Sequence, residues 1–262
     1  MFLKLLNGIG IKVLEVVDNT VTKTGDFVVI SGRSLASIFK RPFDWRNFMH
    51  QLQAVGVNSI PVVALTSLAV SMVFAVQLSF GFKQFQAEGL ASQVEGLAIV
   101  RELAPVITGL MLAGRVGSAM AAEIGTMRVT EQVDALECLA TNPIQFLFVP
   151  RLLASIVMLP ILTGIAIFVG YFGGHIILVG TQGQSSYVYS QNFYLLVSGR
   201  DLAVALIKGL VFGFIIAMIG CWRGYCTRGG AEGVGNAPTS SVVSSSLWIL
   251  ISDFFLTKIF LV

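Results

Sequence analysis

Long apolar runs separated by short polar segments dominate the chain. Five runs reach the roughly 20 residues that a membrane-spanning helix needs. They lie at about 58–80, 95–122, 149–179, 202–222 and from 242 to the C-terminus. The third run is long enough to be tilted, or broken near Pro160. The pattern predicts an all-α integral membrane protein with five transmembrane helices.

The first 50 residues follow a different pattern. Apolar side chains from Phe2 to Val17 recur at helical spacing, interrupted by lysine and asparagine. This is typical of an amphipathic helix lying in the membrane interface, but a cytoplasmic helix packed on protein fits the pattern equally well. We therefore expect an N-terminal interfacial segment, 1–50, followed by a five-helix transmembrane domain, 51–262.

The composition supports a membrane protein and excludes several other classes. Hydrophobic residues make up 55% of the chain and charged residues 12%, against about 25% charged residues in soluble domains. A net charge of +3 gives no reason to expect nucleic-acid binding. The three cysteines match no zinc or disulfide spacing, and no phosphate-binding loop or hydrolase signature is present. The sequence therefore predicts neither a cofactor nor catalytic activity in this chain.

Basic residues are distributed unevenly between the two sides of the predicted spans. The segment before the first span contains Lys4, Lys12, Lys23, Arg33, Lys40, Arg41 and Arg46. The opposite side carries only Lys83, Arg200 and, near the end, Lys258. Because positive charge collects on the cytoplasmic side, the N-terminus is expected in the cytoplasm. With five spans, the C-terminus is then outside.

The second predicted span contains Arg101, Glu102 and Pro105, all of them unusual inside a membrane. A charge at the bilayer centre costs at least about 2.5–3.5 kcal/mol. Arg101 and Glu102 point about 100° apart on a helix, so they cannot form one pair on one face. Lys208 lies at about the same depth in the fourth span, roughly 10 Å below its outer end. The group is either a structural salt bridge or the lining of a solvated cavity that binds an amphiphile.

Small residues recur every four positions in the second and fourth spans. This spacing is typical of helices that approach each other closely in a membrane. The residues are Gly109, Ala113, Gly117 and Ala121 in the second span, and Ala205, Gly209, Gly213 and Ala217 in the fourth.

The inner segment from about 126 to 139 has the pattern of a short amphipathic helix. An apolar stripe follows Val129, Val133 and Leu136, and acidic residues lie between these positions. Such a helix either docks a soluble partner or folds back on the bundle. The later inner segment, 228–241, is rich in glycine and serine and is expected to be a flexible loop.

These same residues resemble a known family. The stretch RELAPVITGLMLAGRVGSAMAAEIGTMRVTEQVDAL, 101–136, closely resembles the signature of MlaE/YrbE-type permeases. LIKGLVFG around Lys208 and SDFFLT around Asp253 resemble later motifs of that family, whereas His175 belongs to none. These permeases are the membrane subunits of ABC transporters that move lipids in bacterial envelopes.

The resemblance implies a set of partners. It suggests a homodimer in the bacterial inner membrane, with each copy bound to a cytoplasmic ATPase that holds ATP and Mg²⁺. A periplasmic assembly of MCE-domain proteins would exchange phospholipid with the dimer and so maintain outer-membrane lipid asymmetry. A small STAS-domain protein often binds the ATPase in such systems.

The resemblance also implies roles for individual residues. A lipid cavity would be lined by Arg101, Glu102, Leu103, Lys208 and Gln77. The segment 126–139 would be the cytoplasmic coupling helix, contacting the ATPase through Arg128, Thr130, Glu131, Asp134 and Leu136.

A second class of function remains open from the residues themselves. An ion-coupled carrier or an intramembrane enzyme would use Glu102 and Asp253, both inside predicted spans. A carrier would respond to a proton gradient and need no ATPase. The sequence favours an inter-helix hydrogen-bonding role for Asp253.

Overall fold

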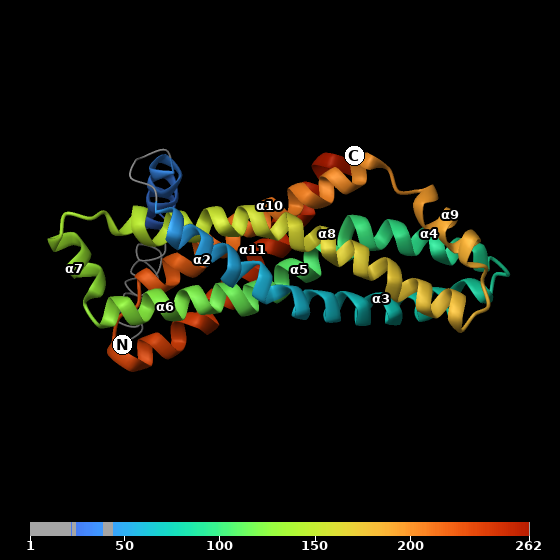
Figure 1. The fold of residues 1–262 in the computed structure, drawn as a ribbon, viewed down its shortest axis with the longest axis horizontal. Helices are drawn as coiled ribbons and strands as arrows, with labels where there is room; N and C mark the ends of the chain where they lie inside the picture. Colours follow the sequence, from blue (N-terminus) through green and yellow to red (C-terminus); the bar gives the residue numbers. More distant parts are fainter. Residues whose placement is uncertain (1–21, 23–24, 39–43, 262) are drawn as a thin grey trace, which may run out of the picture.

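The computed structural model describes residues 22, 25–38 and 44–261, and all regular structure within these ranges is helical (Figure 1). The helices of the bundle run mainly along the long axis of the molecule. The amphipathic helix expected between Phe2 and Val17 lies outside the described residues.

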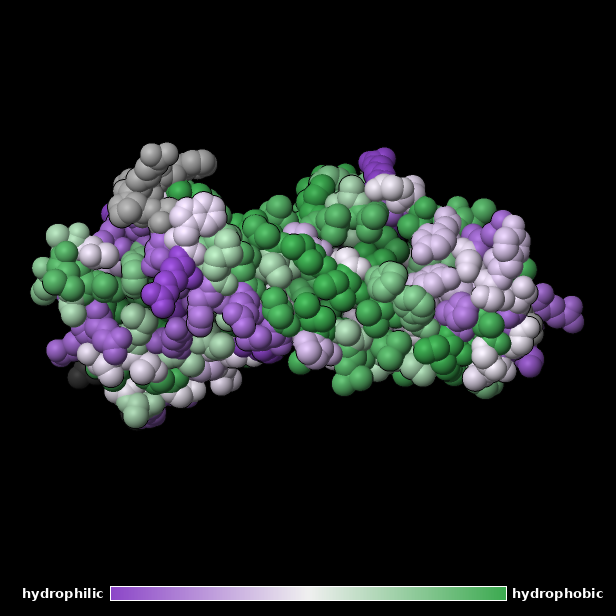
Figure 2. Space-filling view, viewed as in Figure 1, coloured by the Kyte–Doolittle hydropathy of each residue, from purple (hydrophilic) through white to green (hydrophobic). Residues whose placement is uncertain are grey.

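Five helical stretches in the described part are long and apolar enough to cross a membrane, which confirms the all-α, five-span prediction. The stretches are Trp45–Lys83, Gly89–Val129, Ile144–Gly180, Gly199–Tyr225 and Gly230–Phe260. The surface agrees with this assignment, since an apolar band covers the middle of the molecule and hydrophilic residues gather toward both ends (Figure 2).

The first two spans are each built from several helical pieces. The first comprises α2 (Trp45–Val55), a 3₁₀ turn (η1, Val57–Ser59) and α3 (Ile60–Lys83). The second comprises α4 (Glu88–Ala98), α5 (Ala104–Leu112) and α6 (Ser118–Val129), joined by the π-helical turns η2 (Ile99–Leu103) and η3 (Ala113–Gly117). π-Helical turns inside α-helices are uncommon and are frequent at functional sites.

The rest of the bundle combines three long helices with three short elements. They are α7 (Gln132–Cys138), the π-helical turn η4 (Ile144–Phe148), α8 (Val149–Gly180), α9 (Ser186–Leu195), α10 (Gly199–Tyr225) and α11 (Gly230–Leu261). Helix α8 continues through Pro160 without a break. It lies in the centre of the bundle and packs on both α3 and α10.

Small residues allow the central helices to approach closely. The buried face of α3 has a serine or alanine at every fourth position, at Ser67, Ser71, Ala75 and Ser79. A Cβ atom at Gly173 of α8 would lie only 2.8 Å from the Leu68 carbonyl oxygen in the backbone of α3. The core is therefore set by backbone approach as much as by large apolar side chains.

The segment 228–241 is not the loop expected from its composition. Helix α11 begins at Gly230 and includes almost all of this glycine- and serine-rich stretch. Its Ser241 hydroxyl donates to the Gly117 carbonyl oxygen at 3.1 Å, and α11 packs on both α6 and α10. These tertiary contacts outweigh the low helix propensity of glycine.

Candidate functional site: a charged cluster inside the bundle

Lys208 of α10 is completely buried, with 0% of its side chain exposed. Its ammonium nitrogen lies 2.9 Å from Glu102 Oε2 and 2.8 Å from Asp253 Oδ1. It also donates to Thr257 Oγ1 at 2.7 Å and to the Arg101 carbonyl oxygen at 3.0 Å. The three N–H groups of an ammonium are thus shared among four oxygen atoms. We call Lys208, Glu102, Asp253 and Thr257 the Lys208 cluster.

The Lys208 cluster joins three membrane spans. Glu102 comes from the second span, Lys208 from the fourth, and Asp253 and Thr257 from α11. The Thr257 hydroxyl also lies 3.1 Å from Glu102 Oε1 and donates to it, which closes a ring of polar contacts. Asp253 thus connects helices, as expected, but it does so through an ion pair with Lys208.

Pro105 explains one of these contacts. In a regular α-helix the carbonyl of residue 101 accepts the N–H of residue 105. Proline has no N–H, so this acceptor loses its usual donor. The Lys208 ammonium donates to the Arg101 carbonyl in its place. The proline inside the span thus creates a backbone acceptor for the buried lysine.

Arg101 has a partner of its own that the sequence did not reveal. Its Nε lies 2.8 Å from Asp201 Oδ1, near the start of α10. The same aspartate closes a capping box with Ser198, accepting from the Ser198 N–H at 2.9 Å. The S-x-x-D spacing of a capping box was the available sequence signal. Asp201 therefore holds the beginning of α10 and the Arg101 side chain together.

The charges in this region are unequally exposed. Lys208 is fully buried, while the side chains of Glu102 and Arg101 are 38% and 31% exposed. Two cations, Arg101 and Lys208, face three carboxylates, those of Glu102, Asp201 and Asp253. The region can therefore anchor three helices and still present a cation and an anion at its outer edge.

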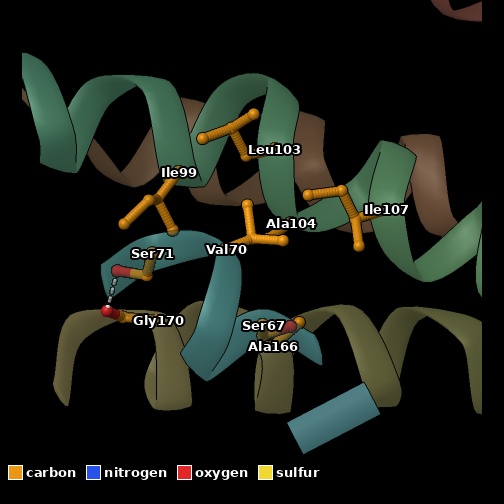
Figure 3. A pocket seen from close by; sticks show the side chains of 9 residues that line it. All are labelled: Ser67, Val70, Ser71, Ile99, Leu103, Ala104, Ile107, Ala166 and Gly170. Carbon is orange, nitrogen blue, oxygen red and sulfur yellow. Dashed lines mark hydrogen bonds between the residues drawn. The ribbon is translucent and has the colours of Figure 1, made fainter. Parts of the chain in front are cut away.

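The two other residues assigned to a lipid cavity lie elsewhere. Leu103 borders a small cavity between α3, the second span and α8, beside Ile99 and across from Ser71 (Figure 3). This cavity measures about 10 Å³, roughly what one water molecule requires. Gln77 is exposed on α3. The structure does not bring either residue into the Lys208 cluster.

A second buried acid, Glu95, was missed because the sequence placed it at the outer start of its span. The structure begins this span at Gly89, so Glu95 lies inside it and is 0% exposed. Its carboxyl oxygens lie 3.2 Å from Ser71 Oγ and 3.5 Å from the Tyr189 hydroxyl. Within the described part of the chain it makes no ion pair. A side chain at Gly174 would collide with this carboxyl group.

Tyr189 attaches the outer helix α9 to the bundle. Its hydroxyl donates to the Tyr171 carbonyl oxygen at 3.0 Å, and its ring lies among Tyr171, His175 and Phe193. Burial, and secondly the neighbouring Glu95 carboxyl, raise the pKa of Tyr189 above its ordinary value. The phenol therefore keeps the proton that it donates. His175 contributes a 2.8 Å contact to Ser186 at the start of the same helix.

The segment assigned to the coupling helix is divided in two. Helix α6 continues to Val129, the backbone turns at Glu131 with φ 60°, and α7 follows. Asp134 forms an ion pair with Arg128, whose guanidinium lies 5.5 Å from the centre of the Tyr225 ring. Val133 is buried, whereas Thr130 and Glu131 are exposed and Leu136 is half-buried. Helix α7 thus packs through Val133 and, in part, Leu136, while the side chains of Asp134 and Glu137 are exposed.

The small residues of the second and fourth spans line close helix contacts. A Cβ at Gly109 would lie 3.0 Å from Phe212, and one at Gly117 would lie 3.3 Å from Ile216, both on α10. Ala113 and Ala121 are fully buried. On the other side of α10, Gly209 and Gly213 face the α8 backbone.

Comparison with known proteins identifies the family of this chain. A family model described as permease MlaE matches residues 48–259, which include the whole Lys208 cluster. The chain belongs to the MlaE permease family. A probable ABC transporter permease protein of Rickettsia felis is 41% identical over 260 residues, covering 99% of each chain. A probable ABC transporter permease protein of Synechocystis sp. is 44% identical over 228 residues, covering 87% of each.

A plant relative extends the family beyond bacteria. The chloroplastic protein TRIGALACTOSYLDIACYLGLYCEROL 1 of Arabidopsis thaliana is 40% identical over 235 residues, which cover 88% of this chain and 66% of the plant protein. With five spans and these relatives, the chain is a multi-pass membrane permease of the ABC-transporter kind, and so a non-catalytic membrane component.

Proposed function

We propose that the chain is the permease of an ABC transporter that moves phospholipid between the bacterial inner membrane and a periplasmic assembly of MCE-domain proteins. In this way it contributes to the lipid asymmetry of the outer membrane. The observation that carries the proposal is the partial exposure of Arg101 and Glu102 beside a fully buried Lys208. A zwitterionic phospholipid presents opposite charges at its headgroup and apolar chains beyond it. A partly exposed cation next to a partly exposed anion, both bordered by an apolar surface, complements such a molecule.

The lipid class draws support from one relative. The Arabidopsis protein bears the name of a galactolipid. Lipid is also the substrate whose shape fits a charged edge in an otherwise apolar bundle. Gln77 and Leu103 belong to this proposal as more distant wall residues, since neither contacts the Lys208 cluster.

We also propose that two copies enclose the lipid chamber. The small cavity beside Leu103 is far too small for a lipid, so a chamber needs walls from another molecule. Helix α11 can supply such a wall, because only 11% of the most apolar part of this helix is buried inside the molecule. The corresponding share for α10 is 56%. Its exposed apolar side chains include Leu247, Phe254 and Phe255.

The partner that supplies energy is proposed to be a cytoplasmic ATPase, which would hold ATP and Mg²⁺ in its own site. Helix α7 fits its docking surface, since Glu131 and Asp134 are exposed at the end opposite α9 (Figure 1). This arrangement puts the N-terminus and α7 in the cytoplasm and the C-terminus in the periplasm. A STAS-domain protein would then bind the ATPase and would not contact this chain.

The test is site-specific photo-crosslinking in the assembled complex of permease and ATPase. Photoreactive residues at positions 101 and 102 should crosslink phospholipid in a way that changes with ATP hydrolysis. The control carries the photoreactive residue in place of Phe168, which is exposed on the apolar surface of α8. This position should crosslink lipid whether or not ATP is hydrolysed.

Two results would contradict the proposal. Lipid crosslinks absent at 101 and 102, but present at the control position, would leave the Lys208 cluster as a structural bridge. Transport that follows a proton gradient and continues without the ATPase would instead favour an ion-coupled carrier using Glu102 and Asp253.

A further inference from the structure

A groove lies at the end of the bundle that carries α7, far from the Lys208 cluster. One cavity of about 380 Å³ is bordered by α2, α6, η4 and α8, and a second of about 270 Å³ by α2, η1, η3 and α6. The two cavities share Gln51 and Glu123, so we treat them together as the α2–α6 groove. Arg115, which borders it, is fourteen residues from Arg101, or about 21 Å of helix rise.

Arg151 is the most unusual residue of the groove. It is only 3% exposed, although a buried guanidinium is costly unless its donors are satisfied. Nη1 donates to the Leu147 carbonyl at 2.8 Å, and Nη2 lies 2.8 Å from Glu123 Oε2. Its buried Nε has no hydrogen-bond partner among the described residues. The groove thus contains a buried cation with one donor still unmatched.

The groove has an excess of positive charge. Its cations are Arg46, Arg115 and Arg151, and its anions are Asp44 and Glu123. With His50 neutral, three positive charges face two negative charges, which leaves +1. Both anions are already engaged, because Asp44 accepts the Asn47 N–H at 3.1 Å and Glu123 pairs with Arg151. Arg46 and Arg115 make no ion pair with any described residue.

The surroundings of the groove are those of a membrane interface. Trp45, next to Arg46 on α2, is 65% exposed, and tryptophan is enriched where the bilayer meets water. Apolar side chains are exposed close by, among them Val57 on η1 and Phe146, which itself borders the groove. Hydrophilic residues over α2 and α6 adjoin the apolar band at this end of the molecule (Figure 2).

We propose that the α2–α6 groove binds the phosphate of a membrane phospholipid in its larger cavity, which Arg46 and Arg151 border. Arg115 borders only the smaller cavity, where its guanidinium donates to the Ser59 hydroxyl. Arginine donors match phosphate oxygens in charge and geometry. The exposed apolar side chains beside the groove take the acyl chains. A free anion would use only the charges, whereas a phospholipid uses both features. The site is independent of the lipid chamber proposed above, and it lies in the leaflet at the α7 end of the bundle.

The test uses the full-length protein in nanodiscs of phosphatidylcholine and phosphatidylglycerol, with a photoreactive residue in place of Asn47. Arg151 is left unchanged, because removing a buried ion-pair partner endangers folding. The variants are Arg46→Gln, in the larger cavity, and Arg115→Gln, in the smaller one. Arg228→Gln removes an exposed arginine outside the groove and is the matched control. Crosslinked phosphatidylglycerol should fall about tenfold in Arg46→Gln, as expected for lost charge-assisted hydrogen bonds, and stay unchanged in Arg115→Gln and in the control.

Competition identifies the source of the phosphate. Unlabelled phosphatidylglycerol, added before irradiation, should lower the crosslinking of labelled phosphatidylglycerol, while diacylglycerol, which lacks phosphate, should not. Unchanged crosslinking in Arg46→Gln would overturn the proposal. So would equal displacement by soluble glycerol phosphate, which would indicate a free-anion site. Complete displacement of lipid by the purified ATPase would overturn it in favour of a protein-docking surface.

Discussion

Glu95 and Glu102 lie seven residues apart in the same membrane span, and the bundle holds them in opposite ways. Glu95 is completely buried against the hydroxyls of Ser71 and Tyr189. Glu102 pairs with the Lys208 ammonium and remains partly exposed. The first carboxyl group is enclosed by neutral partners, whereas the second belongs to a charged cluster that reaches the surface.

The π-helical turn η2 separates their surroundings. In a regular α-helix, seven residues turn through about 700°, which returns a side chain to almost the same face. In η2, which contains Glu102, the Ala104 N–H donates to the Ile99 carbonyl, five residues back, so the turn holds more residues than usual. Glu95 consequently faces α3 and α9, while Glu102 faces α10 and α11. One span thus serves both a packing role and a polar site.

The largest effect is expected from Lys208→Met. It removes the single cation between Glu102 and Asp253 and leaves two carboxylates close together. Breaking such a buried pair costs about 3–5 kcal/mol. The unfolding free energy, or the midpoint of thermal unfolding in detergent, should fall accordingly. Lys258→Met changes an exposed lysine on α11 and should have little effect. Equal losses in both variants would show that the cluster is not stabilising.

A smaller loss is expected from Gly174→Ala, which places a methyl group against the Glu95 carboxyl. Overpacking of this kind typically costs about 1–3 kcal/mol. Gly164→Ala is the matched control, since a Cβ at this position of the same helix meets nothing within 4 Å. Combining Gly174→Ala with Glu95→Ala should recover part of the loss. Additive losses would show that the two positions do not interact.

Asp201→Asn tests whether Arg101 depends on α10. The substitution weakens both the ion pair with Arg101 and the capping box, for an expected cost of about 1–2 kcal/mol. Ser198→Ala removes the Ser198 side chain's part of the cap and should cost about 1 kcal/mol or less. Stability measured by chemical unfolding in detergent should rank the two in this order. The reverse order would mean that the ion pair contributes nothing.

Glu95→Gln should have the smallest effect. Glutamine keeps the shape of the side chain and can still hydrogen-bond to Ser71 and Tyr189. No ion pair with a described residue is broken, so the expected change is below about 1 kcal/mol. A loss as large as that of Lys208→Met, measured in the same way, would show that Glu95 interacts with a cation after all.

The sequence predicts the spans well because apolar length alone determines them. It also places Glu102 and Lys208 at one depth, since both spans run in the same direction and the rise per residue is fixed. The structure brings the two side chains into contact. Such predictions succeed where geometry depends on counting residues along a helix.

Other features depend on contacts that no local pattern contains. The burial of Glu95 results from how the second span packs on α3, α8 and α9. The pairing of Arg101 with Asp201 crosses 100 residues of sequence. The glycine-rich beginning of α11, up to residue 241, was expected to be a loop because of its low helix propensity, and it is helical because α11 packs on α6 and α10.

The central claim is that Glu102 takes part in handling lipid, whereas Glu95 only holds the bundle together. Phospholipid transport by proteoliposomes containing the permease–ATPase complex, normalised to assembled complex, tests this directly. The account predicts that Glu102→Gln lowers transport about tenfold or more, as expected for losing one charged interaction. Glu95→Gln should leave transport within about twofold, since it removes no charged contact. Equal transport by the two variants, or a larger loss in Glu95→Gln, would contradict the account.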